Sequence, residues 1–557
     1  MRERVLAMET VTSVGQPHEM ETLMTERGPI RVFVHAPTSL RDLYAAAESD
    51  ETFLVFGNER YSFRKAINIS NAIAHALTTR FGVKKGDRVA ISMRNYPEWI
   101  FAFMAATSIG AIAVAMNSMW QTEELEYGLI DSTPKVLFTD DERATQFLSL
   151  NNLQSISLVV ARSVSLPKNC ISFSELVADA QQSLLPIVDI QPDDPATIMY
   201  TSGSTGNPKG VLLTQRNIMN AMLSWEVDSI VNQIVSPSKP ETEATHQSAL
   251  LLCVPLFHAT GLIGVTLVAF RSRSKVVGMH KWDPAIAAEL IETEHISLVV
   301  APSAISGDLV REARTSSRNL LSLVGVGGGG ASRSPEQVAE IDQLFPNAIP
   351  RQGWGMTETS ANGTLIYGSE YLQRPLSSGW PTAATELRIL DEHDNEVKAG
   401  TFGELVVRGA MVFPGYWNRP ELNEEVFVDG WFRSGDVAYI DEDGYLFIVD
   451  RIKDLIIRGG ENIGCGQVEA ALMMHPDVHE AAAYAVPDER LGEEVGATVY
   501  ASATLNEADL RAFAAQHLAK FAVPRYITVL TEPLPRTPSG KILKRELRER
   551  AAASISQ

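Results

Sequence analysis

The chain has 557 residues, of which 45% are hydrophobic and 21% are charged, as is usual for a globular protein. Its 48 basic and 68 acidic residues give a net charge of −20, which argues against non-specific binding to nucleic acids or to anionic membrane surfaces. Cys170, Cys253 and Cys465 lie far apart and form no CxxC pair, which argues against a zinc site or a disulfide framework. We expect a cytoplasmic setting.

Residues 1–35 show no clear periodicity, and we expect a loose N-terminal arm. The first residues lack an apolar core long enough for a signal peptide. The longest apolar run, residues 99–116, nearly reaches the length of a membrane span. Because its Ala, Gly and Ser content suits close packing, we predict a buried helix, a break near Gly110 and a buried strand, and no integral membrane span.

Apolar runs alternate with helical patterns from about residue 36 to residue 450. We predict buried strands at residues 88–93, 196–200, 249–254 and 296–301. Apolar residues recur at helical spacing over 215–230, and Thr214 is the expected N-cap of that helix. This alternation predicts a largely α/β core.

The pattern changes near residue 452, where we place a domain boundary. Residues around 450 predict a hairpin, a charged joint and a short strand. Smaller units follow, with strands at 481–487 and 497–502 and a helix at 507–521.

Residues 201–210, TSGSTGNPKG, have the composition of a phosphate-binding loop. Glycines allow backbone N–H groups to converge, hydroxyls add donors, and Lys209 adds charge. The loop does not match the Walker pattern, because Pro208 precedes the lysine and no Ser or Thr follows it. A flexible surface loop is the alternative. A binding site is favoured because the loop follows a buried strand and precedes a strand–helix pair.

Further stretches accompany this loop, namely QGWGMTET at 352–359, WFRSGD at 431–436, DRIKDLIIRGGENI at 450–463 and PRTPSGKILK at 535–544. In this order the segments resemble the adenylate-forming superfamily of acyl-CoA synthetases, firefly luciferases and adenylation domains, over roughly residues 40–545. The resemblance implies an α/β fold, with a large N-terminal domain of stacked mixed sheets and helices and a small mobile C-terminal α+β domain. The implied divisions are an arm (1–35), an adenylate-forming domain (36–452) and a lid domain (453–557).

The resemblance also implies an ATP site. The residues implied at the β- and γ-phosphates are Thr201, Ser202, Gly203, Ser204, Thr205, Gly206 and Lys209. Thr357 is implied at the α-phosphate, Glu358 as a Mg²⁺ ligand, and Asp436 with Arg451 at the ribose. Trp354 stands where the family usually has Tyr or Phe against adenine. The remaining residues of the implied ATP site are Gly329, Gly330, Ala331, Gly353, Gly355 and Met356.

An acyl pocket and a coenzyme A channel are implied as well. The acyl residues are His258, Ala259, Gly261, Val326, Gly327 and Gly328, which suggest a roomy, uncharged pocket. A core histidine and a tight glycine turn are the structural alternatives. The residues implied at the hinge and in the coenzyme A channel are Lys453, Gly459, Gly460, Glu461 and Asn462. Lys541 corresponds to the catalytic lysine, and Cys465 stands where proline is usual, as either a buried or a reactive thiol.

The expected function is ATP-dependent activation of an apolar carboxylic acid (medium- or long-chain fatty, aryl or alicyclic) to acyl-AMP, followed by transfer to coenzyme A. ATP, Mg²⁺ and coenzyme A are the expected cofactors and co-substrates, with no nucleic-acid partner. The alternatives are an enzyme that loads a separate carrier protein, a luciferase-like oxidase, and an ATP-binding module without ligase activity. The identity of the acid and a homodimeric state stay open.

Overall fold

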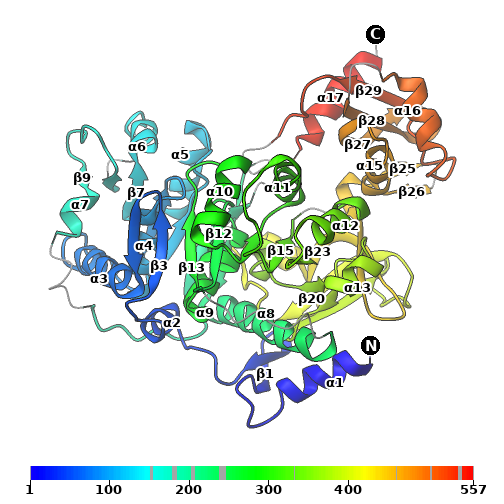
Figure 1. Cartoon of the computed structure of the whole chain (residues 1–557). Coiled ribbons are helices and arrows are strands. Elements are labelled where there is room, and N and C mark those ends of the chain that lie inside the picture. The colour runs from blue at the N-terminus through cyan, green and yellow to red at the C-terminus, as the bar shows by residue number, and fades with distance from the viewer. Residues whose placement is uncertain are drawn as a thin grey trace.

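The computed structural model describes residues 2–150, 153, 155–178, 185–201, 207–236, 246–330, 333–459, 461–501, 505–536 and 542–555, with the backbone alone at Arg2, Lys453, Asn462 and 552–555. Figure 1 shows a large body, coloured blue to yellow, and a small C-terminal domain, coloured orange to red, at its upper right. This arrangement confirms the predicted α/β fold with two domains of unequal size.

Two large sheets form the body. The eight-stranded sheet has the order β21 (Gly415–Tyr416), β11 (Lys209–Thr214), β10 (Pro195–Thr201), β6 (Ile112–Ala115), β5 (Arg88–Ser92), β7 (Val136–Asp140), β8 (Ser157–Ala161) and β9 (Ile171–Ser172). The nine-stranded sheet has the order β18 (Trp380–Pro381), β17 (Thr364–Tyr367), β16 (Ile349–Gln352), β15 (Gly325–Gly328), β14 (Leu298–Val300), β12 (Ala249–Leu252), β13 (Lys275–Gly278), β3 (Thr52–Phe56) and β4 (Glu59–Ser62). The strands predicted from sequence are confirmed as β5, β10, β12 and β14.

Helices cover both faces of each sheet. Those of the body are α2 (Leu40–Ala46), α3 (Phe63–Thr79), α4 (Pro97–Ser108), α5 (Thr122–Ser132), α6 (Asp141–Leu148), α7 (Phe173–Leu176), α8 (Gln215–Val235), α9 (Val268–Ser272), α10 (Pro284–Glu294), α11 (Ser303–Thr315), α12 (Pro335–Leu344), α13 (Gly368–Gln373) and α14 (Pro420–Glu425). Thr214 caps α8 by accepting a hydrogen bond from the Asn217 backbone N–H, as predicted.

Alternation along the strands divides the core into layers. Val89 and Ile91 pack into one cluster with Leu250 of the other sheet and with α3, α4 and α8, so this cluster lies between the sheets. Ala90 points to the opposite side, toward α5 and α6, and Leu251 points toward α10, α11 and α12. Because successive strand residues face opposite sides, strands covered on both faces are apolar throughout.

The apolar run at 99–116 forms the predicted helix, break and strand. Helix α4 is buried along almost its whole length, Gly110 turns the chain with a φ of 69°, and β6 follows. Only glycine adopts this left-handed conformation without a steric penalty. Within the described ranges, no helix has the length and apolar character to cross a membrane.

The N-terminal residues differ from the prediction of a loose arm. They form α1 (Arg2–Val11) and a hairpin of β1 (Met20–Thr25) and β2 (Gly28–Phe33). Helix α1 lies along α8, where the Arg4 guanidinium is within 3.6 Å of Asp228 and 2.7 Å of Glu370. Buried ion pairs and a small apolar cluster around Val32 therefore hold a segment whose periodicity is weak.

Two five-stranded sheets complete the fold. The first contains β19 (Thr385–Leu390), β20 (Gly403–Gly409), β22 (Phe427–Val428), β23 (Trp431–Ile440) and β24 (Leu446–Arg451). The small domain contains β25 (Ile456–Arg458), β26 (Glu461–Ile463), β27 (Val478–Asp488), β28 (Gly492–Ala501) and β29 (Tyr526–Leu530), with α15 (Cys465–Met473), α16 (Glu507–Ala514) and α17 (Lys544–Ile555). A short 3-10 turn, Ile452–Asp454, joins the two.

Helix α16 is shorter than the predicted 507–521. The carbonyl oxygen of Ala514 accepts from the N–H groups of both His517 and Leu518, so the chain leaves the helix in tight turns. The predicted hairpin, joint and strand near residue 450 are confirmed as β23–β24, the 3-10 turn and β25.

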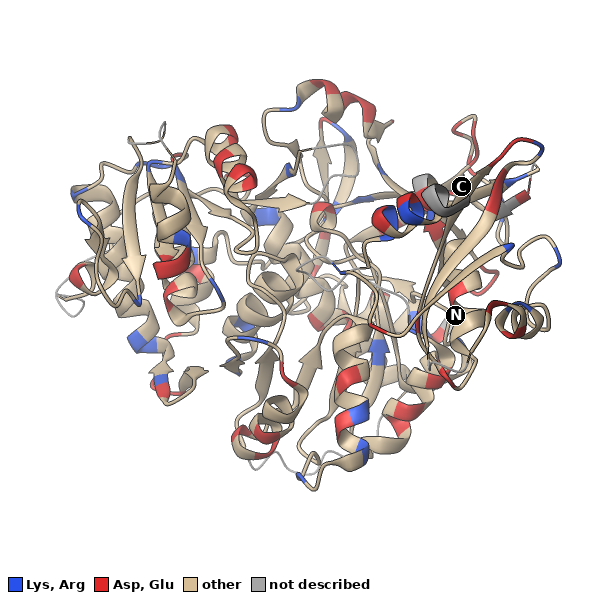
Figure 2. Cartoon of the chain, turned by 90° about the horizontal axis from the view of Figure 1, so that it is seen from above, with Lys and Arg blue, Asp and Glu red and all other residues tan. Residues whose placement is uncertain are grey.

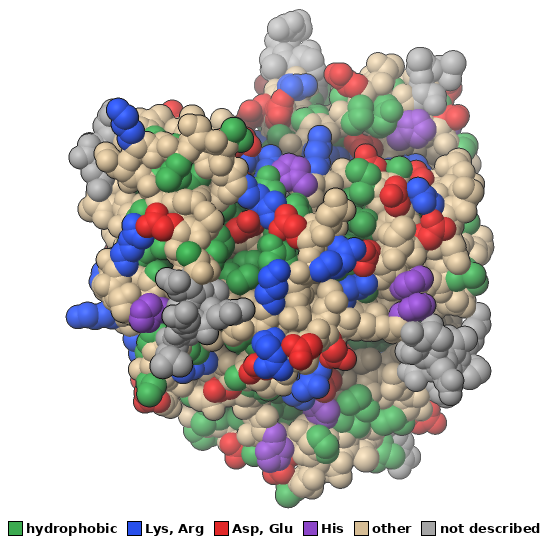
Figure 3. Space-filling model, turned by 60° about the vertical axis from the view of Figure 1, so that its left-hand side comes forward, with side chains coloured by type: hydrophobic (Ala, Val, Ile, Leu, Met, Phe, Trp, Pro, Cys, Tyr) green, Lys and Arg blue, Asp and Glu red, His purple; other side chains and the backbone are tan. Residues whose placement is uncertain are grey.

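Acidic side chains are spread over the whole molecule (Figure 2). On the face in Figure 3, acidic, basic and apolar side chains are interspersed. The net charge of −20 is thus distributed rather than gathered on one element.

Candidate active site

A cavity of about 3450 Å³ extends from the body of the molecule to the small domain. The carboxyl ends of three strands lie on its wall. They belong to β10 of one sheet and to β15 and β16 of the other. The sequence-predicted residues that line it are Thr201, Lys209, His258, Ala259, Gly327, Gly328, Gly329, Gly330, Gly353, Trp354, Gly355, Met356, Thr357, Glu358, Asp436 and Arg451.

Other predicted residues lie elsewhere. Gly261, Val326, Gly459 and Glu461 do not line the cavity. Ser202, Gly203, Ser204, Thr205, Gly206, Ala331, Gly460 and Lys541 lie outside the described residues, as do the side chains of Lys453 and Asn462.

Asp436 is held on both carboxylate oxygens. The strand pairing of β23 with β24 sets Asp436 opposite Arg451, whose Nε lies 2.7 Å from Oδ1. The indole Nε1 of Trp354 donates to Oδ2 at 2.7 Å. A carboxylate oxygen can accept more than one hydrogen bond, so these contacts are compatible with acceptance from the hydroxyl groups of a ligand.

Glu358 is oriented by a tyrosine that sequence reasoning missed. The hydroxyl of Tyr416 donates to Glu358 Oε1 at 2.8 Å. Tyr416 lies on β21, which pairs with the strand that begins at Lys209, and the Lys209 ammonium is 5.5 Å from the centre of the tyrosine ring. Burial, together with the Glu358 carboxylate, raises the pKa of Tyr416 well above its ordinary value, so the hydroxyl remains a donor.

This carboxylate fits a magnesium ion that is shared with a nucleotide. Mg²⁺ takes one or two carboxylates and completes its shell with phosphates and water, rather than using an all-protein cage. Glu358 lies on the cavity wall near Lys209, and no group of three or more potential metal-binding side chains occurs among the residues that the structure describes.

Two separate physical reasons explain why glycine occupies most positions between 325 and 330. A Cβ at Gly325 would lie 2.3 Å from Nη2 of Arg351, and one at Gly327 would lie 2.8 Å from the Cγ of the same side chain. Gly330 has open space around it and a φ of 78°. Gly325 and Gly327 therefore make room for the partly buried side chain of Arg351, while Gly329 and Gly330 leave the cavity wall open.

Gly261 is explained by packing against the backbone. It lies near the start of a π-helix, Thr260–Leu267, and a Cβ there would meet the carbonyl oxygen of Pro255 at 2.5 Å. π-Helices are rare overall, but those that occur are often found at functional sites. His258, just before this helix, lines the cavity and packs against the ring of Phe257, with ring centres 4.6 Å apart.

One face of α8 forms a long part of the cavity wall, which sequence analysis did not assign to the site. The residues of this face are Met222, Trp225, Glu226, Ser229, Ile230 and Gln233. Their spacing is that of a single helical stripe, so the signal was visible but could not show whether the stripe faced a core or a cavity. With Glu226 and Arg351 on the wall, the pocket differs from the expected uncharged one.

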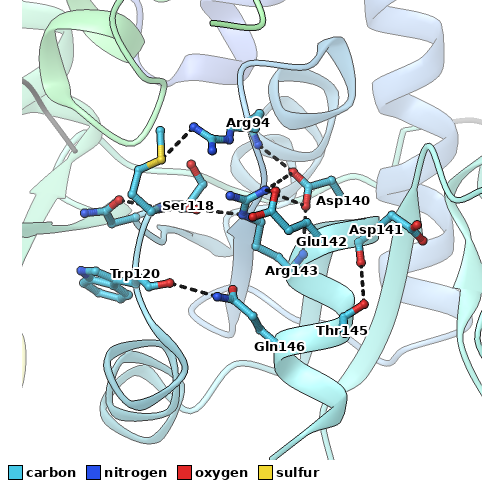
Figure 4. A network of polar contacts seen from close by, with 11 residues as sticks. Arg94, Ser118, Trp120, Asp140, Asp141, Glu142, Arg143, Thr145 and Gln146 are labelled. Atoms are coloured by element: carbon cyan, nitrogen blue, oxygen red, sulfur yellow. Dashed lines mark hydrogen bonds and ion pairs between the residues drawn. The ribbon is translucent and has the colours of Figure 1, made fainter.

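A polar network fixes another part of the wall (Figure 4). Arg143 of α6 donates from Nε to the carbonyl oxygen of Ser118 at 2.7 Å and pairs with Asp140 at 3.3 Å. Gln146 donates to the carbonyl oxygen of Trp120. Residues 117–120 line the cavity, and the Trp120 ring packs edge-on against Tyr200, at the end of the strand that leads into the glycine-rich loop. This network anchors the wall beside the end of β10.

The sequence and the fold were compared with those of known proteins. A model of the AMP-binding enzyme family matches residues 42–417, and a model of the AMP-binding enzyme C-terminal domain matches residues 467–541. The chain belongs to the AMP-binding enzyme family. The predicted resemblance to adenylate-forming enzymes is thereby confirmed.

Relatives of this AMP-binding enzyme are CoA ligases. Feruloyl-CoA synthase of Amycolatopsis sp is 35% identical over 491 residues, which cover 87% of this chain and 92% of that protein. The long-chain-fatty-acid–CoA ligase FadD13 of Mycobacterium tuberculosis is 31% identical over 497 residues, 89% of this chain and 94% of that one. These relatives confirm the predicted class, an AMP-forming acid–thiol ligase with ATP and coenzyme A as substrates, and favour it over carrier loading or a bare ATP-binding module.

Solved structures of an o-succinylbenzoate CoA synthetase from Bacillus subtilis resemble the chain in fold. The complex with the acyl-adenylate intermediate has a TM-score of 0.78 at 27% identity and covers 92% of this chain and 98% of that one. A complex of that synthetase with ATP and a magnesium ion has a TM-score of 0.78 at 26% identity, with 92% and 99% covered.

The small domain of this AMP-binding enzyme is tied to the body across the 3-10 turn. The backbone N–H of Cys465, at the first turn of α15, donates to Oδ2 of Asp450 at the end of β24. The thiol of Cys465 is buried and donates to the carbonyl oxygen of Asp454 at 3.1 Å, and burial raises its pKa above the ordinary range. Cys465 is therefore the inert buried thiol of the two alternatives.

Proposed function

We propose that this AMP-binding enzyme activates a carboxylic acid with a medium-to-long chain or a ring, and that its cavity performs both half-reactions. In the first, a carboxylate oxygen attacks the α-phosphorus of ATP, the bond to the bridging oxygen breaks, and pyrophosphate leaves. In the second, the sulfur of coenzyme A attacks the acyl carbon, AMP leaves and the thiol proton is released. The observation that carries the proposal is that Lys209, Glu358 and Asp436, from three distant segments, line one cavity.

The contacts of these residues give each one a role. The ammonium of Lys209, beside the glycine-rich loop, would neutralise the phosphates that leave. Asp436, held by Trp354 and Arg451, would accept from the ribose hydroxyls, and the Trp354 ring would lie against adenine. Thr357 would donate to the α-phosphate.

Glu358, oriented by Tyr416, is the residue that would hold Mg²⁺. When bound, the ion neutralises charge on the phosphates and favours departure of pyrophosphate. We place the reaction in the cytoplasm, where ATP and coenzyme A are available. Free cysteines such as Cys170, Cys253 and Cys465 stay reduced there.

The lid function of residues 453–557 is part of the proposal. Lys541 would bridge the carboxylate and the α-phosphate during adenylation, and a turn about Lys453 would then bring Gly459 to Asn462 toward the cavity for thioester formation. The short 3-10 turn at Ile452–Asp454 supports a pivot here, because it joins the last strand of the body to the small domain.

Single-turnover assays of each half-reaction test this proposal. Lys541→Ala should slow formation of acyl-AMP by about 10²–10³, the usual loss when one electrostatic contact to a transition state is removed. Thioester formation from supplied acyl-AMP should stay near the wild-type rate. Equal loss in both steps, or loss in neither, would contradict the assigned role of Lys541 and the alternation of the lid.

A further inference from the structure

The wall of the cavity opposite α8 contains a cation that no nucleotide contact requires. Strands β14, β15, β16 and β17 form this wall, and Leu298, Val300, Gly327, Arg351 and Tyr367 line the cavity. The strand register places Arg351 between Gly327 and Tyr367, on the same face of the sheet. Facing it, α8 contributes the stripe that contains Met222 and Trp225. This part of the wall thus has one guanidinium among apolar side chains, with Glu226 on the facing stripe of α8.

The neighbouring strand leaves space for this guanidinium. The side chain of Arg351 crosses Gly327 and reaches Gly325, where any Cβ would occupy its place. The cavity wall extends back along this sheet from Gly328, at the carboxyl end of β15, to Leu298, which pairs with Gly325. At about 3.3 Å per residue, the guanidinium lies roughly 10 Å from the end of the strand.

Arg351 has hydrogen-bonding capacity that the described protein does not use. No described residue accepts a hydrogen bond from its side chain, and Nε is buried without a partner. Its guanidinium packs 5.6 Å from the centre of the Tyr367 ring. Burial lowers its pKa from the ordinary value, with Tyr367 and Asp228 opposing that shift. A partly buried cation without acceptors is unfavourable unless water or a ligand supplies them.

The nearest carboxylate already has another cation. Asp228 of α8 is fully buried and lies 3.6 Å from Nη1 of Arg4, which also pairs with Glu370. Arg4 does not line the cavity, whereas Arg351 does. Because Asp228 and Glu370 both pair with Arg4, the N–H donors of Arg351 are left for the oxygen acceptors of water or a ligand.

We propose that Arg351 is a specificity-determining residue, which selects acids that have an oxygen function remote from the carboxylate to be activated. This inference rests on the proposed function and narrows its substrate class. A guanidinium donates in a planar fork, so a second carboxylate gives the strongest pairing, and a phenol or carbonyl oxygen gives a weaker one. The distance along β15 favours an oxygen about six to eight bonds from the reacting carboxylate.

Pyrophosphate exchange with matched acids tests the inference. The pairs are octanoate with octanedioate, and cinnamate with 4-hydroxycinnamate, so that each pair differs in one remote oxygen function. We expect the wild-type chain to prefer the oxygenated member by about tenfold or more in kcat/KM, as for one hydrogen bond to a charged group. Arg351→Met should remove this preference mainly through the KM of the acid, with the KM of ATP unchanged.

Two further variants separate selection from structure. Arg216→Met removes a cation of α8 that pairs with Asp193 and does not line the cavity, and should keep the preference. Gly325→Ala leaves Arg351 in the sequence but takes the place of its guanidinium, and should reduce the preference as Arg351→Met does. Gly325→Ala also answers the question if Arg351→Met folds poorly.

Three outcomes would overturn the inference. These are a wild-type preference for the plain acids, an undiminished preference in both Arg351→Met and Gly325→Ala, and an equal loss in Arg216→Met. Pyrophosphate exchange with the plain acids alone would be consistent with the proposed function but would contradict selection by Arg351. Absence of exchange with every acid would overturn the proposed function itself, and the inference with it.

Discussion

Trp354 does more at its position than a phenyl ring does. The family usually has Tyr or Phe there, and neither has a ring N–H that could donate as the indole does to Asp436 at 2.7 Å. The indole is thus fixed in orientation by the same carboxylate that is proposed to bind the ribose. In the proposed site, base contact and sugar contact would be coupled through one hydrogen bond.

Trp354→Phe should therefore weaken ATP binding and blur recognition of the sugar. A hydrogen bond to a charged group contributes about 1.5–3 kcal/mol, and Arg451 retains part of the orientation, so we expect the KM of ATP to rise about three- to tenfold. The preference for ATP over 2′-deoxyATP should fall, with a smaller change in kcat. Steady-state pyrophosphate exchange with both nucleotides measures this.

Trp417→Phe is the matched control, because its indole N–H donates to the backbone oxygen of Asp131 and the residue does not line the cavity. It should lower the melting temperature and leave both nucleotide constants unchanged. If Trp354→Phe keeps full discrimination between the nucleotides, the indole does not orient Asp436.

The candidate site could be predicted from sequence where its residues lie within contiguous motifs. Lys209, Glu358 and Asp436 were found in this way. Tyr416 was missed because its hydrogen bond to Glu358 depends on the pairing of β21 with β11, which brings together residues far apart in the chain. Gly261 shows the opposite limit, since its motif was visible but its glycine is required by the Pro255 carbonyl oxygen rather than by the cavity.

At the scale of elements, α15 begins with a contact that the usual proline could not make. Gly464 is the N-cap and Cys465 the first helical residue, a position where proline is well tolerated. Proline has no N–H, however, so it cannot donate to Asp450 as Cys465 does. The start of α15 is thus fastened to the last strand of the body.

Cys465→Pro should free the small domain without disrupting its helix. We expect several-fold faster limited proteolysis in the segment around residues 452–464, and a change of no more than a few degrees in the melting temperature. Cys465→Ser keeps both the N–H and a side-chain donor for Asp454, and should be cleaved at the wild-type rate. Unchanged proteolysis of Cys465→Pro would show that the contact does not restrain the domain.

Strands and helices of the body were predictable because their burial is uniform. Strands β5 and β12 are apolar on both faces, and α4 is apolar around its whole circumference, so composition alone marked them. Helix α1 has no such signal, with few buried apolar residues and a position fixed by the ion pairs of Arg4. Pairing partners in three dimensions decide such segments, and a single sequence does not show them.

At the scale of the whole molecule, residues 2–35 connect parts that are distant in sequence. Besides the contact of Arg4 with α8 and α13, Arg27 donates to the carbonyl oxygen of Pro414 at 2.6 Å and packs over the Phe427 ring at 3.6 Å. The family model begins only at residue 42. An element outside the family match therefore supports both the wall helix α8 and the region beside Tyr416.

Removal of residues 2–35 should destabilise the chain more than loss of a surface arm does. Asp228 would lose its paired cation, and breaking a buried pair in this way typically costs about 3–5 kcal/mol. Thermal and chemical unfolding of the truncated chain measure the loss. Combining the truncation with Asp228→Asn should recover part of it, and no recovery would show that the ion pair is not the cause.

The pairing of β21 with β11 also sets the order in which parts of the sheet can form during translation. Val211, in the strand after the glycine-rich loop, is paired with Tyr416, so roughly two hundred residues must leave the ribosome before that strand gains its outer neighbour. At about 5–20 residues per second, this takes roughly 10–40 s. During that interval the nascent chain presents β11 as an open sheet edge, which other chains or chaperones can contact. The proposed nucleotide site is thus completed late in synthesis, when Tyr416 pairs with β11 and its hydroxyl can orient Glu358.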